Sequence, residues 1–198
     1  EKISSIDFFN FLQPVNRVLD LFYQNRTSIE GNIETTFNSI KDTIANLLKV
    51  GNSFKKQLFK GKQYDFVLLF NSRNIRRKQI PDTMLAYRHF IDKLPIEQAK
   101  KCCLLLHTEL VTEHGTDLPA VQELLLNGEQ YNVVFTNQVF NNYQMNLLYN
   151  STDCQIQLTS NEGWGLSLTE AMLVGNPIIA NVTGGMQDQM RFEFEDGT

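Results

Sequence analysis

From residue 65 onward, short apolar runs alternate with segments of helical periodicity, and this alternation restricts the fold more than any other feature. The runs expected as strands are 65–70, 102–106, 133–135, 154–158 and 177–180. The segments expected as helices between them are 83–91, 118–126, 143–149 and 168–174. Because the apolar runs are nearly continuous, they suit strands that are covered on both faces. The pattern predicts an α/β fold with a doubly wound, Rossmann-like parallel sheet.

The first 60 residues have a different texture. A polar stretch over 24–34 precedes an amphipathic segment over 40–48, and a lysine-rich hydrophilic connector follows it. We expect residues 1–60 to be the end of a preceding domain with its linker. Residues 61–198 are then expected to form the sheet domain, truncated at its C-terminus.

The cysteines and the hydropathy of the chain indicate the cellular compartment of the protein. Cys102 and Cys103 are adjacent and Cys154 stands apart, which gives neither a disulfide framework nor a metal-ligand spacing. No apolar run reaches the roughly 18 residues of a membrane-spanning helix. These features predict a protein of the cytoplasm without a transmembrane segment.

The charges are unevenly distributed. From Lys62 onward the chain has 10 Lys and Arg residues against 16 Asp and Glu residues, a net charge of −6. Four of those cations lie within six residues, namely Arg73, Arg76, Arg77 and Lys78. A concentrated positive patch on an acidic background suits a small anionic ligand, whereas a nucleic-acid polymer requires a broad basic face.

The cation cluster follows the first expected strand. Ligands of doubly wound sheets bind at the carboxyl ends of the strands. An arginine forms two-pronged hydrogen bonds with phosphate and a lysine adds a mobile point charge, so the pair suits a diphosphate. A solvated basic loop before a helix is the alternative, but the position in the fold favours ligand binding.

The loop after the fourth expected strand contains Gly163 and Gly165 and runs directly into a helix. Glycines leave backbone N–H groups unshielded, and a helix N-terminus attracts anions, so a phosphate fits here. No G-x-G-x-x-G fingerprint follows the first strand and no G-x-x-x-x-G-K-[ST] loop occurs. Their absence argues against a nicotinamide or flavin dehydrogenase and against a P-loop NTPase.

Two glutamates flank these glycines. Ser167 and Glu170 have the spacing of a capping box, with Gly175 as the C-terminal stop of the helix, and this structural role stays open for Glu170. Glu162 precedes the glycines, where a carboxylate suits the hydroxyl groups of a sugar. We therefore expect Glu162 to bind a ligand.

These residues together resemble a known family. Glu162, seven intervening residues and Glu170 match the signature of retaining glycosyltransferases of the GT-B architecture, the glycosyl transferases group 1 family. Arg73, four intervening residues and Lys78 match the Arg and Lys on the first loop of that family's donor domain. The resemblance covers roughly residues 65–185, and the two motifs occur in the family's order. It implies that residues 1–60 are the end of the N-terminal acceptor-side domain with its linker, and that residues 61–198 are the domain that binds the nucleotide-sugar donor.

The resemblance implies a role for each matching residue. Arg73 and Lys78 would hold the donor diphosphate, Glu162 would face the transferred sugar, and Glu170 would hold the ribose. Arg73, Lys78 and Glu162 are then the catalytic residues, and the donor-binding residues are Gly163, Gly165, Leu166, Glu170, Thr136 and Val139. Thr136 replaces a glycine often found where the family contacts the base.

The activity implied is transfer of a sugar, with retention, from a nucleoside diphosphate sugar to a hydroxyl of an acceptor. The acceptor could be a glycan, lipid, protein or small molecule. No Asp-x-Asp occurs, which fits an enzyme without a metal cofactor. The chain alone is expected to be inactive. A nucleotide-sugar epimerase of the same architecture and a non-catalytic sugar-nucleotide-binding module are the alternatives.

Some residues are left with open roles. Trp164 either leans on the sugar or fills the loop, and His107 ends the second strand as either a structural or a cleft residue. Asn181, Gly184 and Gly185 follow the last strand, and we expect them to line the donor pocket.

Overall fold

The computed structural model describes residues 33–190. The chain divides into two compact units, one comprising Glu1–Gly61 with Phe140–Leu148 and the other Lys62–Val139 with Tyr149–Thr198. The predicted acceptor-side segment, residues 1–60, lies partly outside the described residues and stays a prediction, as does the truncation of the sheet domain.

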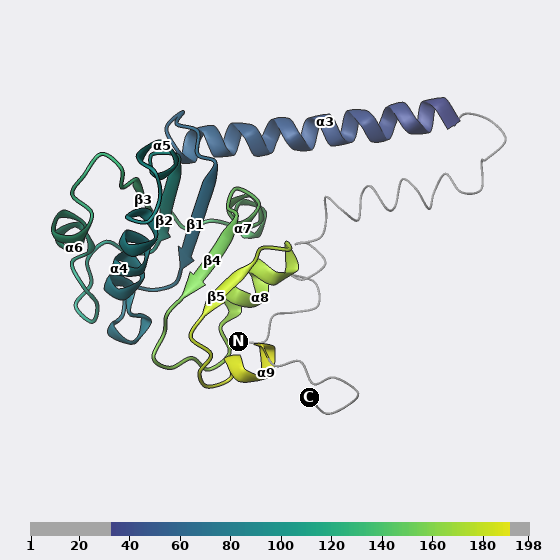
Figure 1. The fold of residues 1–198 in the computed structure, drawn as a ribbon. Helices are drawn as coiled ribbons and strands as arrows, with labels where there is room; N and C mark the ends of the chain where they lie inside the picture. The colour runs from purple at the N-terminus through teal and green to yellow at the C-terminus, as the bar shows by residue number, and fades with distance from the viewer. Residues whose placement is uncertain (1–32, 191–198) are drawn as a thin grey trace, which may run out of the picture. The chain divides into compact units, whose positions relative to one another are not determined.

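The first unit contains the helix α3 (Ile33–Leu58), which is longer than the predicted amphipathic segment (Figure 1). Lys55 and Lys56 belong to its last turn, where cations meet the negative end of the helix dipole, so this part of the expected hydrophilic connector is helical. In the same unit the rings of Phe54 and Phe140 pack edge to face with centroids 5.7 Å apart. No helix of the described residues is long and apolar enough to cross a membrane.

The second unit is built on five parallel strands in the order β3-β2-β1-β4-β5, which confirms the predicted fold class (Figure 1). The strands are β1 (Phe66–Asn71), β2 (Cys102–His107), β3 (Val133–Thr136), β4 (Cys154–Gln157) and β5 (Ile178–Ala180). All five predicted strands are present, and β1, β2 and β4 are buried along most of their length, as strands covered on both faces are.

The four predicted helices are α4 (Ile80–Ile91), α6 (Leu118–Leu125), α7 (Asn142–Tyr149) and α8 (Leu166–Leu173). The structure adds a 3-10 turn, η2 (Arg76–Lys78), and two short helices, α5 (Ile96–Ala99) and α9 (Met186–Met190). The three added elements are too short for a helical hydrophobic period to appear in the sequence.

The strand order fixes the place where a ligand can bind. The chain moves from β1 outward to β2 and β3, and then returns to the other side of β1 to form β4 and β5. Right-handed crossovers in opposite directions place α4 and α8 on opposite faces of the sheet. The crevice at the carboxyl ends of β1 and β4 is therefore the topological switch point of this sheet.

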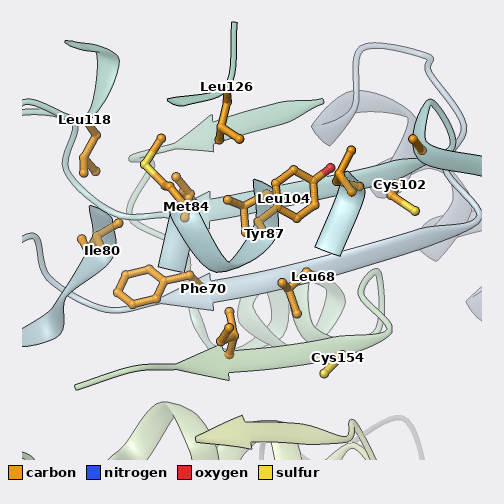
Figure 2. Packing of buried hydrophobic residues seen from close by; sticks show 14 residues of the cluster. Leu68, Phe70, Ile80, Met84, Tyr87, Cys102, Leu104, Leu118, Leu126 and Cys154 are labelled. Atoms are coloured by element: carbon orange, nitrogen blue, oxygen red, sulfur yellow. The ribbon is translucent and has the colours of Figure 1, made fainter. Parts of the chain in front are cut away.

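The main core lies between the sheet and α4 with α6 (Figure 2). Alternate strand residues such as Leu68, Phe70 and Leu104 pack there against Met84 and Tyr87 of α4. Tyr87 is buried and donates its hydroxyl to the carbonyl oxygen of Asn132 at 3.2 Å. This packing buries β1, which carries one half of the switch point.

Candidate active site

Two loops meet at the switch point, and we name them by their content. The cation loop comprises residues 73–78 after β1, and the glycine loop comprises residues 158–165 after β4. Gln79 has a left-handed backbone conformation, with φ 48°, and turns the chain from η2 into α4. Lys78, the residue before this turn, is buried although it is a lysine.

An ion pair joins the two loops. The Glu162 carboxylate oxygen Oε2 accepts a hydrogen bond from Lys78 Nζ and another from Arg77 Nη1 at 3.2 Å. The side chains of Lys78 and Glu162 are only 8% and 11% exposed. The other carboxylate oxygen, Oε1, accepts from the backbone N–H of Gly163 at 3.2 Å. The structure thus brings together two of the three predicted catalytic residues.

The charges of the cluster do not balance. Burial raises the pKa of Glu162, but hydrogen bonds and charge attraction from Lys78 and Arg77 outweigh it and hold that pKa below its usual value. Burial lowers the pKa of Lys78 by more than Glu162 raises it, and the charges of Arg77 and Arg73 lower it further. Two cations therefore pair with one carboxylate while a third, Arg73, acts on Lys78 through its charge, so positive charge is left over for an anionic ligand.

Arg77 is recognised in the sequence as one of four clustered cations, but no role is predicted for it. Its guanidinium donates to the carbonyl oxygen of Asn161 at 2.5 Å. Its own carbonyl oxygen accepts from the backbone N–H of Ser160 at 2.9 Å and from Thr159 Oγ1 at 2.9 Å. Arg77 therefore ties the cation loop to the glycine loop. Its place next to Lys78 was the available signal.

Asn74 anchors the cation loop to the loop that follows β2. Its buried amide donates to the carbonyl oxygen of Thr116 at 2.7 Å and accepts from the Thr116 N–H at 3.0 Å. Gly115 permits this approach, because a Cβ at that position would lie 2.3 Å from Asn74 Oδ1. Arg73, one residue earlier, remains exposed.

The glycine loop ends at a helix N-terminus that is open to an anion. Gly165 has φ 83° and is the N-cap of α8, and no side chain of the described residues caps this end. The capping box that the sequence left open for Glu170 is not formed: Ser167 is the second helical residue, and Glu170 accepts a hydrogen bond from Tyr149. The predicted stop at Gly175 is confirmed, with φ 80° there and an Asn176 N–H bond to the Ala171 carbonyl oxygen at 3.0 Å.

Residues after β5 brace the glycine loop. The N–H of Gly185 donates to the Glu162 carbonyl oxygen at 3.0 Å, and the Asn181 amide donates to the Thr159 carbonyl oxygen at 3.1 Å. A Cβ on Gly185 would lie 1.7 Å from the Gly163 carbonyl oxygen, and one on Gly184 would lie 2.1 Å from that of Glu162. These glycines allow backbone to pack directly on backbone.

Glu170 has a partner that the sequence did not predict. Its Oε2 accepts a hydrogen bond from the buried Tyr149 hydroxyl at 2.6 Å. The Tyr149 oxygen in turn accepts from the Asn71 amide at 2.7 Å. Burial raises the pKa of Glu170 above its usual value, and the Tyr149 hydrogen bond partly opposes this rise.

The predicted base-binding residues are farther from the switch point. Thr136 ends β3, two strands from β1, and its carbonyl oxygen accepts from the Thr108 N–H at 3.0 Å. Val139 is 99% exposed. No contact between these two residues and the Glu162 cluster is found in the described part of the chain, so base recognition there stays a prediction.

The remaining candidates are placed as follows. Leu166 begins α8 and is half exposed, directly beside the glycine loop. Trp164 donates from Nε1 to Thr169 Oγ1 at 3.1 Å, which fastens the loop to α8 while much of the ring stays exposed. His107 is half-buried, and burial lowers its pKa despite a hydrogen bond with the Thr136 backbone.

Comparison with known proteins identifies a family that part of this chain resembles. Residues 119–197 match the family Glycosyl transferases group 1. Over 72 residues the chain is 36% identical to a trehalose synthase of Pyrococcus horikoshii, a match that covers 35% of this chain and 16% of that enzyme. The matched stretch is thus a small part of the relative.

Solved structures show the same fold at low identity. One is the C-terminal domain of a glycosyl transferase group 1 family protein from Francisella tularensis, with a TM-score of 0.55, 17% identity and 70% of each chain covered. Another is a sucrose-phosphate synthase from Thermosynechococcus elongatus, with a TM-score of 0.53, 22% identity and coverage of 71% of this chain and 34% of that one. The resemblance that the motifs indicated is thereby confirmed: residues 119–197 are similar to the glycosyl transferases group 1 family, and the sheet domain has the fold of such proteins.

Proposed function

We propose that this chain is the donor-binding part of a retaining glycosyltransferase that uses a nucleoside diphosphate sugar. The observation that carries the proposal is the cation cluster at the β1/β4 switch point, where Arg77 and Lys78 pair with the single carboxylate of Glu162 and the charge of Arg73 acts on Lys78. A diphosphate diester, with one negative charge on each phosphate, complements the excess positive charge. The family match supports the same substrate class.

The Lys78–Glu162 ion pair suggests how the donor would bind. In the structure the Glu162 carboxylate accepts a hydrogen bond from Lys78, the buried cation that would bind a diphosphate. A bound diphosphate would replace the carboxylate as the partner of Lys78, and Glu162 would then be available to accept hydrogen bonds from the sugar hydroxyls. The uncapped N–H groups at the start of α8 would bind a phosphate oxygen.

The same residues would assist the reaction. As the bond between the anomeric carbon and the β-phosphate oxygen breaks, negative charge grows on that oxygen, and Lys78 and Arg73 would stabilise it. The acceptor oxygen would bond to the anomeric carbon on the same face, and its proton would pass to the leaving diphosphate. The proposal gives charge neutralisation to these side chains and requires no metal cofactor.

Calorimetric titration of the 198-residue chain tests the proposal. The ligands are the nucleosides uridine, adenosine and guanosine, their monophosphates and their diphosphates. UDP-, ADP- and GDP-glucose complete the set. We expect affinity for one base to increase from nucleoside to monophosphate to diphosphate, because the cation cluster contacts the phosphates. Absence of binding by every diphosphate, or equal binding of nucleoside and diphosphate, would contradict it.

A further inference from the structure

Tyr149 lies between two polar side chains that come from different parts of the sheet domain. Asn71 ends β1, and Glu170 lies on α8. The Asn71 amide donates to the tyrosine oxygen at 2.7 Å, and the tyrosine hydroxyl donates to Glu170 Oε2 at 2.6 Å. A tyrosine has a single hydroxyl proton, so the Asn71 hydrogen bond directs that proton to the glutamate.

This chain of hydrogen bonds fixes the carboxylate of Glu170. Tyr149 is fully buried and Glu170 is half-buried, so neither side chain reorients freely in solvent. Tyr149 is the hydrogen-bond partner of Glu170 found among the described residues, and it engages Oε2 alone. The second oxygen is therefore held in a defined direction and remains able to accept from a ligand.

We infer that Tyr149 is a positioning residue that orients Glu170 for recognition of the ribose hydroxyls of a nucleotide. The inference rests on the proposed function and on the ribose contact that the family resemblance implies for Glu170. A carboxylate that must accept from neighbouring hydroxyls gains affinity when its rotation is fixed before the ligand arrives. Asn71 completes the arrangement by supporting the tyrosine from β1.

The ionisation of Glu170 supports the same role. Burial raises the pKa of Glu170, and the hydrogen bond from Tyr149 opposes that rise. Removing the tyrosine hydroxyl would therefore raise the pKa of Glu170 further. At a given mildly acidic pH, a larger fraction of Glu170 would then be protonated, and a protonated carboxyl group accepts hydrogen bonds from hydroxyl groups poorly.

The test compares Tyr149→Phe with the wild-type chain. Affinity is measured for ADP, GDP and UDP and for their 2′,3′-dideoxy analogues between pH 5 and pH 8. The ratio of the two affinities isolates the ribose contact, because the titration of the phosphates affects both ligands equally. Tyr131→Phe is the matched control, since it removes a hydroxyl that donates to the exposed carboxylate of Asp92, and Glu170→Gln removes the ribose contact itself.

We expect Tyr149→Phe to lower the ribose-to-dideoxyribose ratio about tenfold, as loss of a hydrogen bond to a charged group does. The pH below which the ribose-to-dideoxyribose ratio falls should be higher in Tyr149→Phe than in the wild-type chain, and it should stay unchanged in Tyr131→Phe. A general destabilisation of the fold would lower the affinity for both ligands alike and leave the ratio unchanged.

Three results would overturn the inference at different levels. If Glu170→Gln lowers the ratio while Tyr149→Phe retains the wild-type ratio and pH profile, Tyr149 has no positioning role. If Glu170→Gln also retains the ratio, Glu170 does not contact the ribose. If the wild-type chain binds none of the diphosphates, the proposed function fails together with this inference.

Discussion

Replacing Glu162 by Gln is expected to lower the free energy of unfolding by about 3 kcal/mol, because the buried ammonium of Lys78 then loses its carboxylate partner. Arg77 loses the same carboxylate partner, so the side chains of the cation loop no longer pair with residue 162 of the glycine loop. Urea unfolding followed by circular dichroism measures the change.

The matched control for this variant is Glu129→Gln. Glu129 pairs with Lys100 at 3.0 Å, but the two side chains are 87% and 41% exposed, so the loss should be at most about 1 kcal/mol. The double variant Glu162→Gln/Lys78→Met should recover part of the stability lost by Glu162→Gln, because no buried charge is then unpaired. Equal losses in Glu162→Gln and Glu129→Gln would contradict the account of a buried pair.

The ion pair also predicts a pH dependence with a definite sign. The folded-state pKa of Glu162 is lowered, so its contribution to stability is fully present above the unfolded-state value of 4.5 and is lost as the pH falls through the folded-state pKa. The difference in stability between the wild-type chain and Glu162→Gln should therefore shrink in acid below pH 4.5. A difference that grows in acid would contradict this sign.

The second large effect concerns ligand affinity. The double variant Arg73→Ala/Lys78→Ala should weaken binding of the preferred nucleoside diphosphate about a hundredfold or more, since two charge-assisted contacts to phosphate are lost. Arg73→Ala alone should weaken binding about tenfold without affecting the fold, because this side chain is exposed. Isothermal titration calorimetry measures both.

A charge-matched variant controls for general electrostatics. Arg88→Ala/Lys101→Ala also removes two cations from the same unit, but these side chains pair with Asp92 and Asp65 on the surface. It should retain nearly wild-type affinity. If both double variants weaken binding equally, the diphosphate is attracted by net charge and not by the cation loop.

The sheet could be predicted because its evidence is local in the sequence. Runs such as 66–70 and 102–106 are nearly continuous in apolar residues, and the structure places them as the central strands β1 and β2. β4 is less regular, since Gln155 and Gln157 are fully buried, and their amides have no hydrogen-bond partner among the described residues. Hydropathy alone does not predict buried glutamines.

The site could be predicted only as far as its motifs extend. The Arg73 to Lys78 spacing and the Glu162 to Glu170 spacing identified residues that the switch point brings to adjacent loops. The roles of Arg77 and Tyr149 depend on contacts across many residues, such as Tyr149 with Asn71, 78 positions apart. The capping box failed because Gly165 takes the N-cap position and Tyr149 binds the Glu170 carboxylate.

A crystal structure of the chain with its preferred nucleoside diphosphate tests the central claim most directly. The account predicts that the diphosphate lies between the cation loop and the glycine loop, that Lys78 Nζ donates to a phosphate oxygen, and that Glu162 no longer binds Lys78. A diphosphate bound elsewhere on the sheet domain, with the Lys78–Glu162 ion pair intact, would contradict it.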